Sequence, residues 1–324
     1  MRDYPFFIIG HPRSGTTLLR FMLSTHSRLY IPEETGFLPF LNVNPDKPLM
    51  ETEIQDLLTR IGKLNYLWQD LPITAGQISA VYQQPTLAVV VNELYQQQAA
   101  QHDASRWGDK TPLYIQYIPN ILEIFPQAQF IHMIRDGRDA ALSALEKWGS
   151  ESAYMDLYYL LKNWVRNVSA GRNFGRYADR DRYLEVHYES LVAAPEVVLR
   201  QICVFLGENF ESSMLDHTNT AHQAGPGPAG HFKALQPVFD VSVYRWKTEM
   251  GSFQRKLSAK IAGDLLLELG YELPDDGPMR LRERVLTLFL ALRFSFFDLI
   301  RTVLYRTGII TLNRTMRTPK PEQA

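Results

Sequence analysis

The stretch FFIIGHPRSGTTLLRFML, residues 6–23, constrains the fold of this chain more than any other. Four apolar residues, Phe6 to Ile9, are typical of a buried strand, and the turn that follows at 10–15 leads into apolar residues with helical spacing. A strand, a glycine turn and a helix in this order favour phosphate binding, because the N–H groups of the turn and of the helix N-terminus attract anions. We therefore expect an α/β fold whose first loop binds a phosphate compound.

The loop lacks the lysine of nucleoside triphosphatases. The signature G-x-x-x-x-G-K-[ST] fits at Gly10 and Gly15, but Thr16 occupies the lysine position. Arg13 supplies a positive charge from earlier in the turn. The hydroxyl groups of the loop belong to Ser14, Thr16 and Thr17. This set of side chains suits a nucleotide with a short, doubly charged 5′ group and no γ-phosphate.

Strands alternate with helices along the following residues. Buried strands are predicted at 128–136 and 182–189, and helices at 53–61, 86–101, 140–147 and 195–206. This alternation predicts a parallel sheet with helices packed against it. Because ligands of such sheets bind at the carboxyl ends of the strands, the turns at 10–17 and 135–138 are expected to share one edge.

Composition argues against several classes of protein. The formal net charge at pH 7 is −1, so no overall basic field predicts a nucleic-acid partner. The single cysteine, Cys203, excludes an internal disulfide framework and a cysteine-based zinc site, and its apolar surroundings predict a buried thiol. No cluster of histidines or carboxylates has metal-ligand spacing, so we expect no metal.

Neither terminal region predicts insertion into a membrane. The apolar run in MRDYPFFIIG is too short for a signal peptide. Arg293, Asp298 and Arg301 interrupt residues 285–304, the longest apolar stretch near the C-terminus. We therefore expect a cytoplasmic protein.

Residues 279–317 form a distinct basic region. They carry eight arginines against Glu283 and Asp298, a local charge of +6. An apolar stripe with helical spacing runs from Leu281 to Val303. The arginines off this stripe include Arg280, Arg284, Arg301 and Arg306. Such a helix packs on its own domain, pairs with a second copy as a homodimer, or lies peripherally on an anionic membrane, and the sequence leaves these three alternatives open.

The domain boundaries follow from this change in composition. We expect residues 1–278 to form one domain, 279–317 to form a basic amphipathic helical extension, and 318–324 to form a disordered tail. The glycine- and proline-rich segment 222–231 is interpreted as a mobile loop within the first domain rather than as a linker.

A second motif, RDGRDAALSA, places Arg135 at a strand end and Ser143 two helical turns further on. Three motifs together resemble the sulfotransferases that use 3′-phosphoadenosine 5′-phosphosulfate, above all the tyrosylprotein branch and its bacterial relatives. In chain order the motifs are PRSGTT, RDGRDAALS and VHYESLVAAPEVVLRQICVFLG. The resemblance covers roughly residues 5–271, including VYRWKTEMG. It implies a P-loop-type three-layer fold, sulfuryl transfer to a hydroxyl or amine, and no metal.

The resemblance also implies roles for individual residues. The 5′-phosphosulfate side is assigned to Arg13, Ser14, Gly15, Thr16 and Thr17. Arg135 and Ser143 are assigned to the 3′-phosphate, and Tyr188 to contact with the nucleotide. Arg245 and Lys247 belong to a late loop that closes over the 3′-phosphate side.

The catalytic base is sought on the acceptor side of the site. PEETGFLP resembles the EET of the tyrosylprotein branch, which assigns the base role to Glu34. Successive side chains of an extended segment point in opposite directions, so only one of Glu33 and Glu34 should face the cleft. Lys110 in WGDKTP is implied as a second catalytic cation beside Arg13, in a loop, with an ion pair to Asp109 as its alternative.

Histidines are the competing bases. His11, inside the turn, is the second candidate, His26 is a further one, and His132 is interpreted as a core residue. Gly36 departs from the tyrosylprotein branch, where an arginine contacts the peptide, which weakens protein tyrosine as the acceptor. A small-molecule, carbohydrate or lipid-linked acceptor is expected instead. Five aromatic residues are candidates for lining the acceptor site, although packing in the core is favoured for most of them. They are Tyr66, Trp68, Tyr82, Tyr95 and Trp148.

Two other functional classes compete. A P-loop kinase would share the fold but needs the lysine that Thr16 replaces. A non-catalytic membrane- or partner-docking protein would keep the basic C-terminal region and a degenerate phosphate loop. Five charged or hydroxyl residues of the sulfotransferase pattern are present, which argues against a loss of catalytic activity. They are Arg13, Glu34, Lys110, Arg135 and Ser143.

Overall fold

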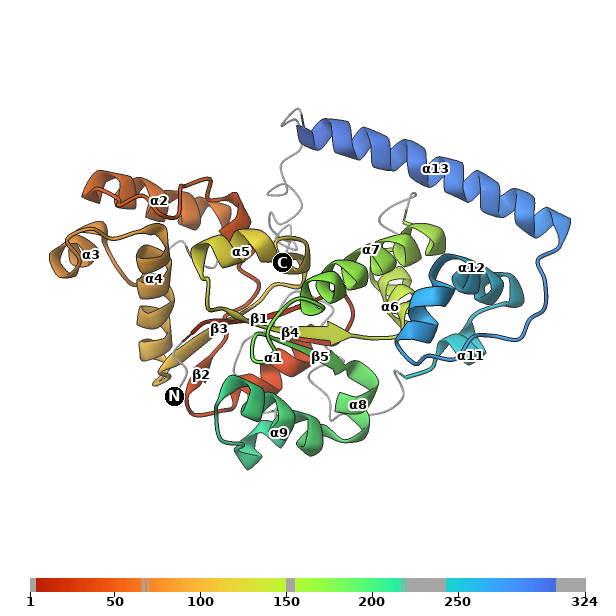
Figure 1. Cartoon of the computed structure of the whole chain (residues 1–324), viewed down its shortest axis with the longest axis horizontal. Helices are drawn as coiled ribbons and strands as arrows, with labels where there is room; N and C mark the ends of the chain where they lie inside the picture. The colour runs from red at the N-terminus through yellow and green to blue at the C-terminus, as the bar shows by residue number, and fades with distance from the viewer. Residues whose placement is uncertain are drawn as a thin grey trace, which may run out of the picture.

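A five-stranded sheet forms the centre of the protein (Figure 1). The computed structural model describes residues 4–65, 68, 70–149, 155–216, 218 and 243–306. The strands are β1 (Phe6–Gly10), β2 (Leu29–Tyr30), β3 (Arg106–Lys110), β4 (Gln129–Ile134) and β5 (Tyr183–His187). Their order is β2-β3-β1-β4-β5, and every paired neighbour is parallel. The parallel α/β sheet predicted from the sequence is therefore confirmed.

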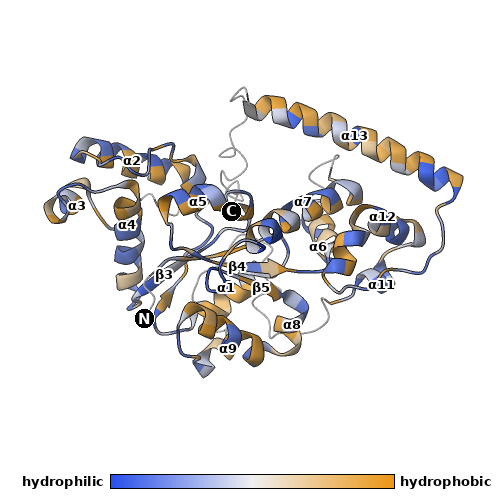
Figure 2. Cartoon of the chain, viewed as in Figure 1, coloured by the Kyte–Doolittle hydropathy of each residue, from blue (hydrophilic) through white to orange (hydrophobic). Residues whose placement is uncertain are grey.

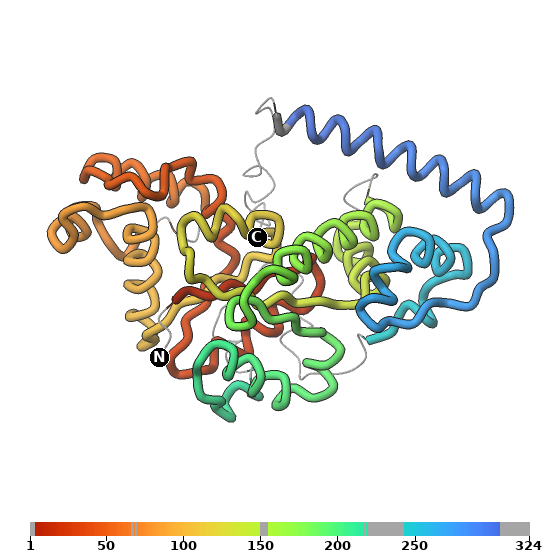
Figure 3. The backbone as a smooth tube through the Cα atoms, viewed as in Figure 1, coloured from red at the N-terminus to blue at the C-terminus, as the bar shows by residue number. Residues whose placement is uncertain are grey.

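Helices cover both faces of this sheet, as Figures 1 and 3 show. Phe6 and Ile8 of β1 pack with side chains of α1 (Thr16–Ser24) and α9 (Pro195–Leu206). Phe7 and Ile9 pack with those of α2 (Glu51–Leu64), α4 (Leu87–Gln101) and α5 (Ile118–Ile124). Alternate residues of one strand thus belong to two different cores, as the period of a strand requires. The result is a three-layer arrangement with β1 buried in the middle.

The helices were only partly predicted. Those described are α1 (Thr16–Ser24), α2 (Glu51–Leu64), α3 (Ala75–Val81), α4 (Leu87–Gln101), α5 (Ile118–Ile124), α6 (Gly137–Trp148), α7 (Leu157–Gly175), α8 (Tyr188–Ala193), α9 (Pro195–Leu206), α11 (Trp246–Glu249), α12 (Ser252–Glu268) and α13 (Leu281–Arg306). Short 3₁₀ turns are η1 (Leu38–Phe40), η3 (Pro112–Gln116) and η4 (Ser212–Leu215). The predicted stop of α9 at Gly207 is confirmed, since this residue has the left-handed φ of 78°. The predicted strand 182–189 is too long, because α8 begins at Tyr188.

Strand β3 was missed, and the expectation that Lys110 lies in a loop is wrong. The sequence RWGDK carries three charged residues, yet all five positions of β3 are buried between β1 and β2. Burial of charge is tolerated where each group finds a polar partner. Arg106, for example, donates to the carbonyl of Leu206 at 2.6 Å and to the amide oxygen of Gln129 at 2.6 Å. Lys110 is the last residue of the strand.

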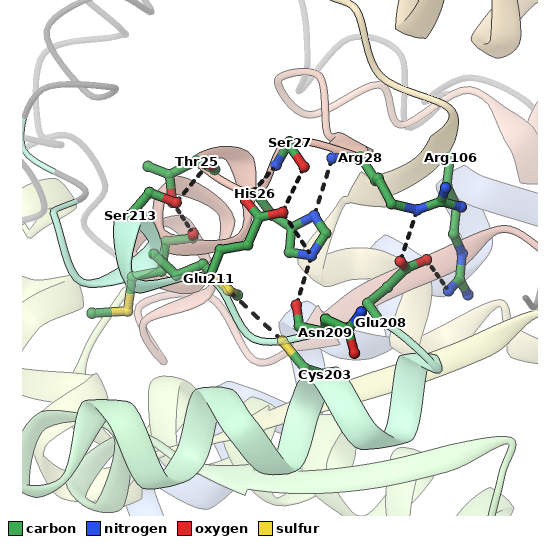
Figure 4. Close-up of polar contacts among 12 residues, drawn as sticks. Thr25, His26, Ser27, Arg28, Arg106, Cys203, Glu208, Asn209, Glu211 and Ser213 are labelled. Carbon is green, nitrogen blue, oxygen red and sulfur yellow. Dashed lines mark hydrogen bonds and ion pairs between the residues drawn. The ribbon is translucent and has the colours of Figure 1, made fainter.

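A polar cluster ties α1 to the region after α9 (Figure 4). Glu208 accepts hydrogen bonds from Arg28 Nε at 3.0 Å and from buried Arg106 NH1 at 3.3 Å. His26 Nε2 lies 2.8 Å from the carbonyl of Asn209, and Nδ1 accepts from the N–H of Arg28. His26, one of the competing bases, is thus held in this cluster. Cys203 is buried nearby, as predicted, with its thiol 3.7 Å from Met214 Sδ.

Some predictions concern residues that the structure does not describe. The loop 222–231, residues 307–317 of the basic extension, the tail 318–324 and Tyr66 lie outside the described residues. Within the basic extension, the structure describes helix α13, which runs from Leu281 to Arg306. No helix among the residues that the structure describes is long and apolar enough to cross a membrane.

Replacing Glu208 tests the cluster of Figure 4. Glu208→Ala should lower the free energy of unfolding by about 3 kcal/mol, because it leaves the buried Arg106 guanidinium without its carboxylate. Glu196→Ala is the control, since Glu196 forms an exposed pair with Arg200 and its loss should cost about 0.5 kcal/mol. Denaturant unfolding monitored by circular dichroism measures both. Equal losses would show that the buried pair adds nothing beyond a surface pair.

Candidate active site

The carboxyl ends of the strands bring the candidate residues to one edge of the sheet. β1 ends at Gly10 and leads into the phosphate loop, and β3 ends at Lys110. Arg135 follows β4 directly, and Tyr188 follows β5. The order β3-β1-β4 places β1 between the other two, so the loop lies at the centre of this edge.

The loop after β1 is built to bind an anion. Arg13 and Gly15 have the left-handed φ values of 70° and 88°, which turn the chain sharply into α1. The first N–H groups of a helix have no acceptor within the helix, and no side chain caps α1 at Gly15. Ser14 Oγ is buried without a hydrogen-bond partner among the described residues. These donors converge where the motif predicted phosphate binding.

Tyr188 packs directly on the loop. A Cβ atom at Gly15 would lie 2.3 Å from Cδ2 of Tyr188, so only glycine fits beneath this ring. The guanidinium of Arg135 lies over the same ring, 4.7 Å from its centroid. Arg135 NH1 also donates to the carbonyl of Arg13 at 2.9 Å. Three motifs separated in sequence therefore share one contact region.

Arg13 and Ser143 connect the two predicted phosphate subsites. Arg13 Nε donates to Ser143 Oγ at 3.1 Å, and Ser143 lies in α6. Asp136 accepts from the N–H of Arg138 and so caps the start of this helix. Burial, and then the neighbouring positive charge of Arg135, lower the pKa of Arg13. Two cations held this close favour an anion between them.

Lys110 and Glu34 form an ion pair beside the first turn of α1. Lys110 Nζ lies 2.6 Å from Glu34 Oε1 and 3.5 Å from Thr17 Oγ1. The Lys110 side chain is only 3% exposed, whereas that of Glu34 is 47% exposed. The alternative pairing of Lys110 with Asp109 is wrong, because adjacent residues of a strand point to opposite sides.

Asp109 instead holds the segment that carries Glu34. Its carboxylate accepts hydrogen bonds from Thr35 Oγ1, from Tyr95 OH at 2.5 Å and from Thr111 Oγ1 at 2.7 Å. Burial raises the pKa of Asp109, and these donors oppose the shift. Thr35 is buried while the preceding Glu34 is exposed, so the alternation expected of an extended segment is observed.

His11 is a poor base in this environment. Burial lowers the pKa of His11 to about 3, so its ring is neutral at pH 7 and binds protons weakly. Nδ1 lies 2.9 Å from Nδ2 of Asn167 in α7. His132 is a core histidine, as predicted, with Nδ1 2.5 Å from the hydroxyl of Tyr183 and a pKa lowered by burial to about 3.

The late cations Arg245 and Lys247 already have carboxylate partners. Arg245 NH2 pairs with Glu146 and, at 2.7 Å, with Glu249, and these hydrogen bonds raise the pKa of Arg245. Lys247 pairs with Glu272. Their assignment to the 3′-phosphate side stays a prediction.

Of the aromatic residues considered for the acceptor site, Trp68, Tyr82 and Tyr95 make their contacts elsewhere in the protein. Trp68 and Tyr95 are buried in one core, as core packing predicts. Tyr82 donates to Glu93 at 2.8 Å. Trp148 is different, because its ring lies 5.8 Å from the guanidinium of Arg13. Among the described residues, no group of three or more histidines, cysteines or carboxylates could hold a metal ion.

Two parts of this site were not predicted from the sequence. One is the Asp109 network, whose signal was the polar sequence WGDKT a few residues after the helix predicted at 86–101. The other joins α6 to α11: the guanidinium of Arg138 lies 3.6 Å from the ring centroid of Trp246, and the backbone N–H of Trp246 donates to Asp139 Oδ1 at 2.9 Å. Burial raises the pKa of Asp139 to about 6.

Comparison with known proteins decides the family. The model described as the sulfotransferase family matches residues 5–212. This chain belongs to the sulfotransferase family. The resemblance drawn from the motifs, and the enzyme class that it implied, are thereby confirmed.

Curated relatives and solved structures agree with this family. A protein-tyrosine sulfotransferase of Drosophila melanogaster is 26% identical over 281 residues, which cover 84% of this sulfotransferase and 52% of the relative. Protein-tyrosine sulfotransferase 1 of Danio rerio is 27% identical over 282 residues, 84% of this chain and 73% of the relative. The chain thus spans about half of the first relative and about three quarters of the second.

The sulfotransferase domain from the Synechococcus PCC 7002 olefin synthase aligns with a TM-score of 0.56 and 25% identity, over 84% of this chain and 98% of that domain. The sulfotransferase domain from the curacin biosynthetic pathway aligns with a TM-score of 0.52 and 23% identity, over 84% and 99% respectively. Both likenesses support the predicted P-loop-type fold.

Substitution of Gly15 tests the contact between the loop and Tyr188. Gly15→Ala should abolish binding of adenosine 3′,5′-bisphosphate, because the new methyl group and the ring cannot occupy the same space. Gly270→Ala is the matched control: Gly270 has a similar φ of +81° but nothing within 4 Å of the added Cβ atom. Both variants carry the left-handed strain, of about 1 kcal/mol, and only the first has the clash. Isothermal titration calorimetry measures binding, and equal affinities for the two variants would contradict this packing.

Proposed function

We propose that this sulfotransferase transfers a sulfuryl group from 3′-phosphoadenosine 5′-phosphosulfate to a hydroxyl acceptor, with Glu34 as the base. The observation that carries the proposal is the position of Lys110. Its ammonium group lies 2.6 Å from Glu34 and 3.5 Å from Thr17, so a carboxylate and a cation meet at the first turn of the phosphate-loop helix.

The donor set fits this substrate. The free N–H groups at the start of α1 and the buried Ser14 hydroxyl suit the 5′-phosphosulfate, and Arg13 adds charge. Arg135 and Ser143 suit the 3′-phosphate. Tyr188, which packs between Gly15 and Arg135, offers an aromatic surface to the nucleotide. The set contains arginines and hydroxyls in place of the lysine that a triphosphate needs.

The reaction needs one base and a cation for the leaving group. The acceptor oxygen attacks sulfur, and its proton passes to the carboxylate of Glu34. The bond from sulfur to the bridging oxygen of the phosphosulfate breaks, and Lys110 and Arg13 stabilise the charge that develops on that oxygen. The products are a sulfate ester and adenosine 3′,5′-bisphosphate.

Exposure distinguishes the roles of the two partners. Glu34 is about half exposed, which lets an acceptor approach its carboxylate, whereas Lys110 is buried beside the loop. The ion pair holds Glu34 at the loop, and the Asp109 network fixes the backbone that carries it. His11 is excluded from the base role in this proposal because its lowered pKa leaves it a weak base.

The acceptor proposed is a small-molecule, carbohydrate or lipid-linked hydroxyl. Relatives are named for protein tyrosine, but Gly36 stands where that branch places a peptide-contacting arginine. Gly36 also has a φ of 66°, a conformation that L side chains adopt rarely. A residue that lacks the peptide-contacting side chain and has this backbone conformation favours an acceptor that does not need this arginine.

Glu34→Gln tests the base. The variant should lose at least about a hundredfold in kcat, since general-base catalysis typically contributes this much, while its affinity for adenosine 3′,5′-bisphosphate stays unchanged. Glu33→Gln is the matched control and should keep its activity. Release of adenosine 3′,5′-bisphosphate from the donor measures turnover for any acceptor. Activity of Glu34→Gln within a few-fold of wild type would remove Glu34 from the base role.

Arg135→Ala tests whether Arg135 binds the 3′-phosphate. This variant should bind adenosine 3′,5′-bisphosphate about tenfold or more weakly, because a charged hydrogen-bond partner is lost, but should bind adenosine 5′-phosphate almost as well as wild type. Arg200→Ala, an exposed arginine of α9, is the control. Calorimetric titration of both ligands gives the ratio. Equal losses for the two ligands would show that Arg135 acts on the fold or on another group.

A further inference from the structure

Helix α13 contacts the rest of the protein through one side. Phe294 packs against Tyr158 and Tyr159 near the start of α7, with ring centroids 5.8 and 6.0 Å apart. On the same side, Asp298 pairs with Arg166 at 3.2 Å. Thr287 is the buried residue of this side, at 4% exposure. The inner side of α13 is therefore already occupied by its own domain.

The opposite side of α13 is apolar and exposed. Residues at intervals of three or four positions form a stripe of large side chains, and Figure 2 shows how much of this helix is hydrophobic. The stripe consists of Leu281, Val285, Leu288, Leu292, Phe296, Leu299 and Val303, each between 49% and 78% exposed. The sequence left packing of this stripe on its own domain open, and the structure shows it facing outward. An apolar surface of this length is unusual for a chain that acts alone.

Charge is distributed unevenly around the helix. Its acidic residues, Glu283 and Asp298, are turned towards the domain, where they pair with Lys256 and Arg166. Arg282 and Arg284 are exposed. At 100° per residue, these two positions lie on either side of the stripe. The outward surface thus combines apolar side chains with positive charge at its flanks.

A basic pocket lies at the beginning of this helix. It has a volume of about 340 Å³ and is lined by residues of α12, of the connection to α13 and of its first turn, including Lys256, Lys260 and Arg284. Lys256 pairs with Glu283 at 3.3 Å. Among the residues that the structure describes, no carboxylate pairs with Lys260 or Arg284. These two cations suit an anionic group at the end of the apolar stripe.

We propose that α13 docks this protein on the surface of a bilayer that contains anionic phospholipid. The apolar stripe enters the boundary between headgroups and acyl chains, Arg282 and Arg284 flank it at headgroup depth, and the basic pocket takes a phosphate headgroup. A second copy fits less well, because two copies would bring the same basic groups together and leave the pocket without a counter-charge. Charge complementarity therefore selects the anionic membrane.

Vesicle binding by the full chain tests this docking surface. Wild type should co-sediment with vesicles of phosphatidylcholine and phosphatidylglycerol, and less with phosphatidylcholine alone. Leu288→Gln/Leu292→Gln/Leu299→Gln, which keeps good helix formers, should lower the partition constant by about tenfold or more. Val81→Gln/Val197→Gln/Val204→Gln is the matched control, since these exposed valines lie on α3 and α9 and should leave binding unchanged.

A second variant isolates the charge. Arg282→Gln/Arg284→Gln should remove most of the preference for anionic vesicles, and added salt should have the same effect on wild type. Unchanged melting temperatures, and unchanged binding of adenosine 3′,5′-bisphosphate, show that each variant is folded. Neither readout depends on catalysis, so the result stands apart from the proposed reaction.

Three results would overturn the proposal. One is a wild-type chain that stays in solution with anionic vesicles, and another is a triple leucine variant that binds them as well as wild type. The third comes from light scattering: a wild-type dimer that becomes monomeric in the leucine variant, without vesicle binding by either, would assign the stripe to a second copy.

Discussion

The buried carboxylate of Asp109 is the constraint on which the geometry of the proposed Glu34–Lys110 pair depends. A carboxylate inside the protein must be satisfied by donors, and here the donors are three hydroxyl groups from Thr35, Tyr95 and Thr111. Satisfying Asp109 fixes Thr35 in the core and turns the neighbouring Glu34 outward. The next residue of the strand, Lys110, then faces the other way, towards Glu34 and the phosphate loop.

In the proposed function, the phosphate loop serves a substrate without a γ-phosphate. Backbone N–H groups at the start of α1 provide the part of the site that any phosphate can use. The differences lie in the side chains: arginine at position 13 takes over the positive charge, and Tyr188 occupies the space that only Gly15 leaves open. Arg135 stacks on this tyrosine, so a residue proposed to bind the 3′-phosphate is in contact with the residue that packs on the loop.

Sequence patterns predicted the elements in which each residue type matches its position in the fold, such as apolar residues at buried positions. β1 and β4 are apolar and buried, and α9 has proline at its start and glycine at its stop, so local and global preferences coincide. β3 could not be predicted in this way, because its charged residues are satisfied by partners that are distant in sequence. The partner of Lys110 is 76 positions away. The phosphate loop and the RDGRD motif carry local signals, whereas the Asp109 network and the contact of Arg138 with Trp246 exist only after folding.

The identity of the phosphate ligand distinguishes a sulfotransferase site from a kinase site. Thermal unfolding of the wild-type chain should be measured with adenosine 3′,5′-bisphosphate, with adenosine 5′-phosphate and with ATP and Mg²⁺. A ligand that binds only the folded state raises the melting temperature, and the rise grows with the logarithm of the ratio of its concentration to its dissociation constant. We expect adenosine 3′,5′-bisphosphate to raise it most, because it alone fills both subsites, and ATP with Mg²⁺ to raise it little. A larger rise with ATP and Mg²⁺ would contradict the account and favour a kinase.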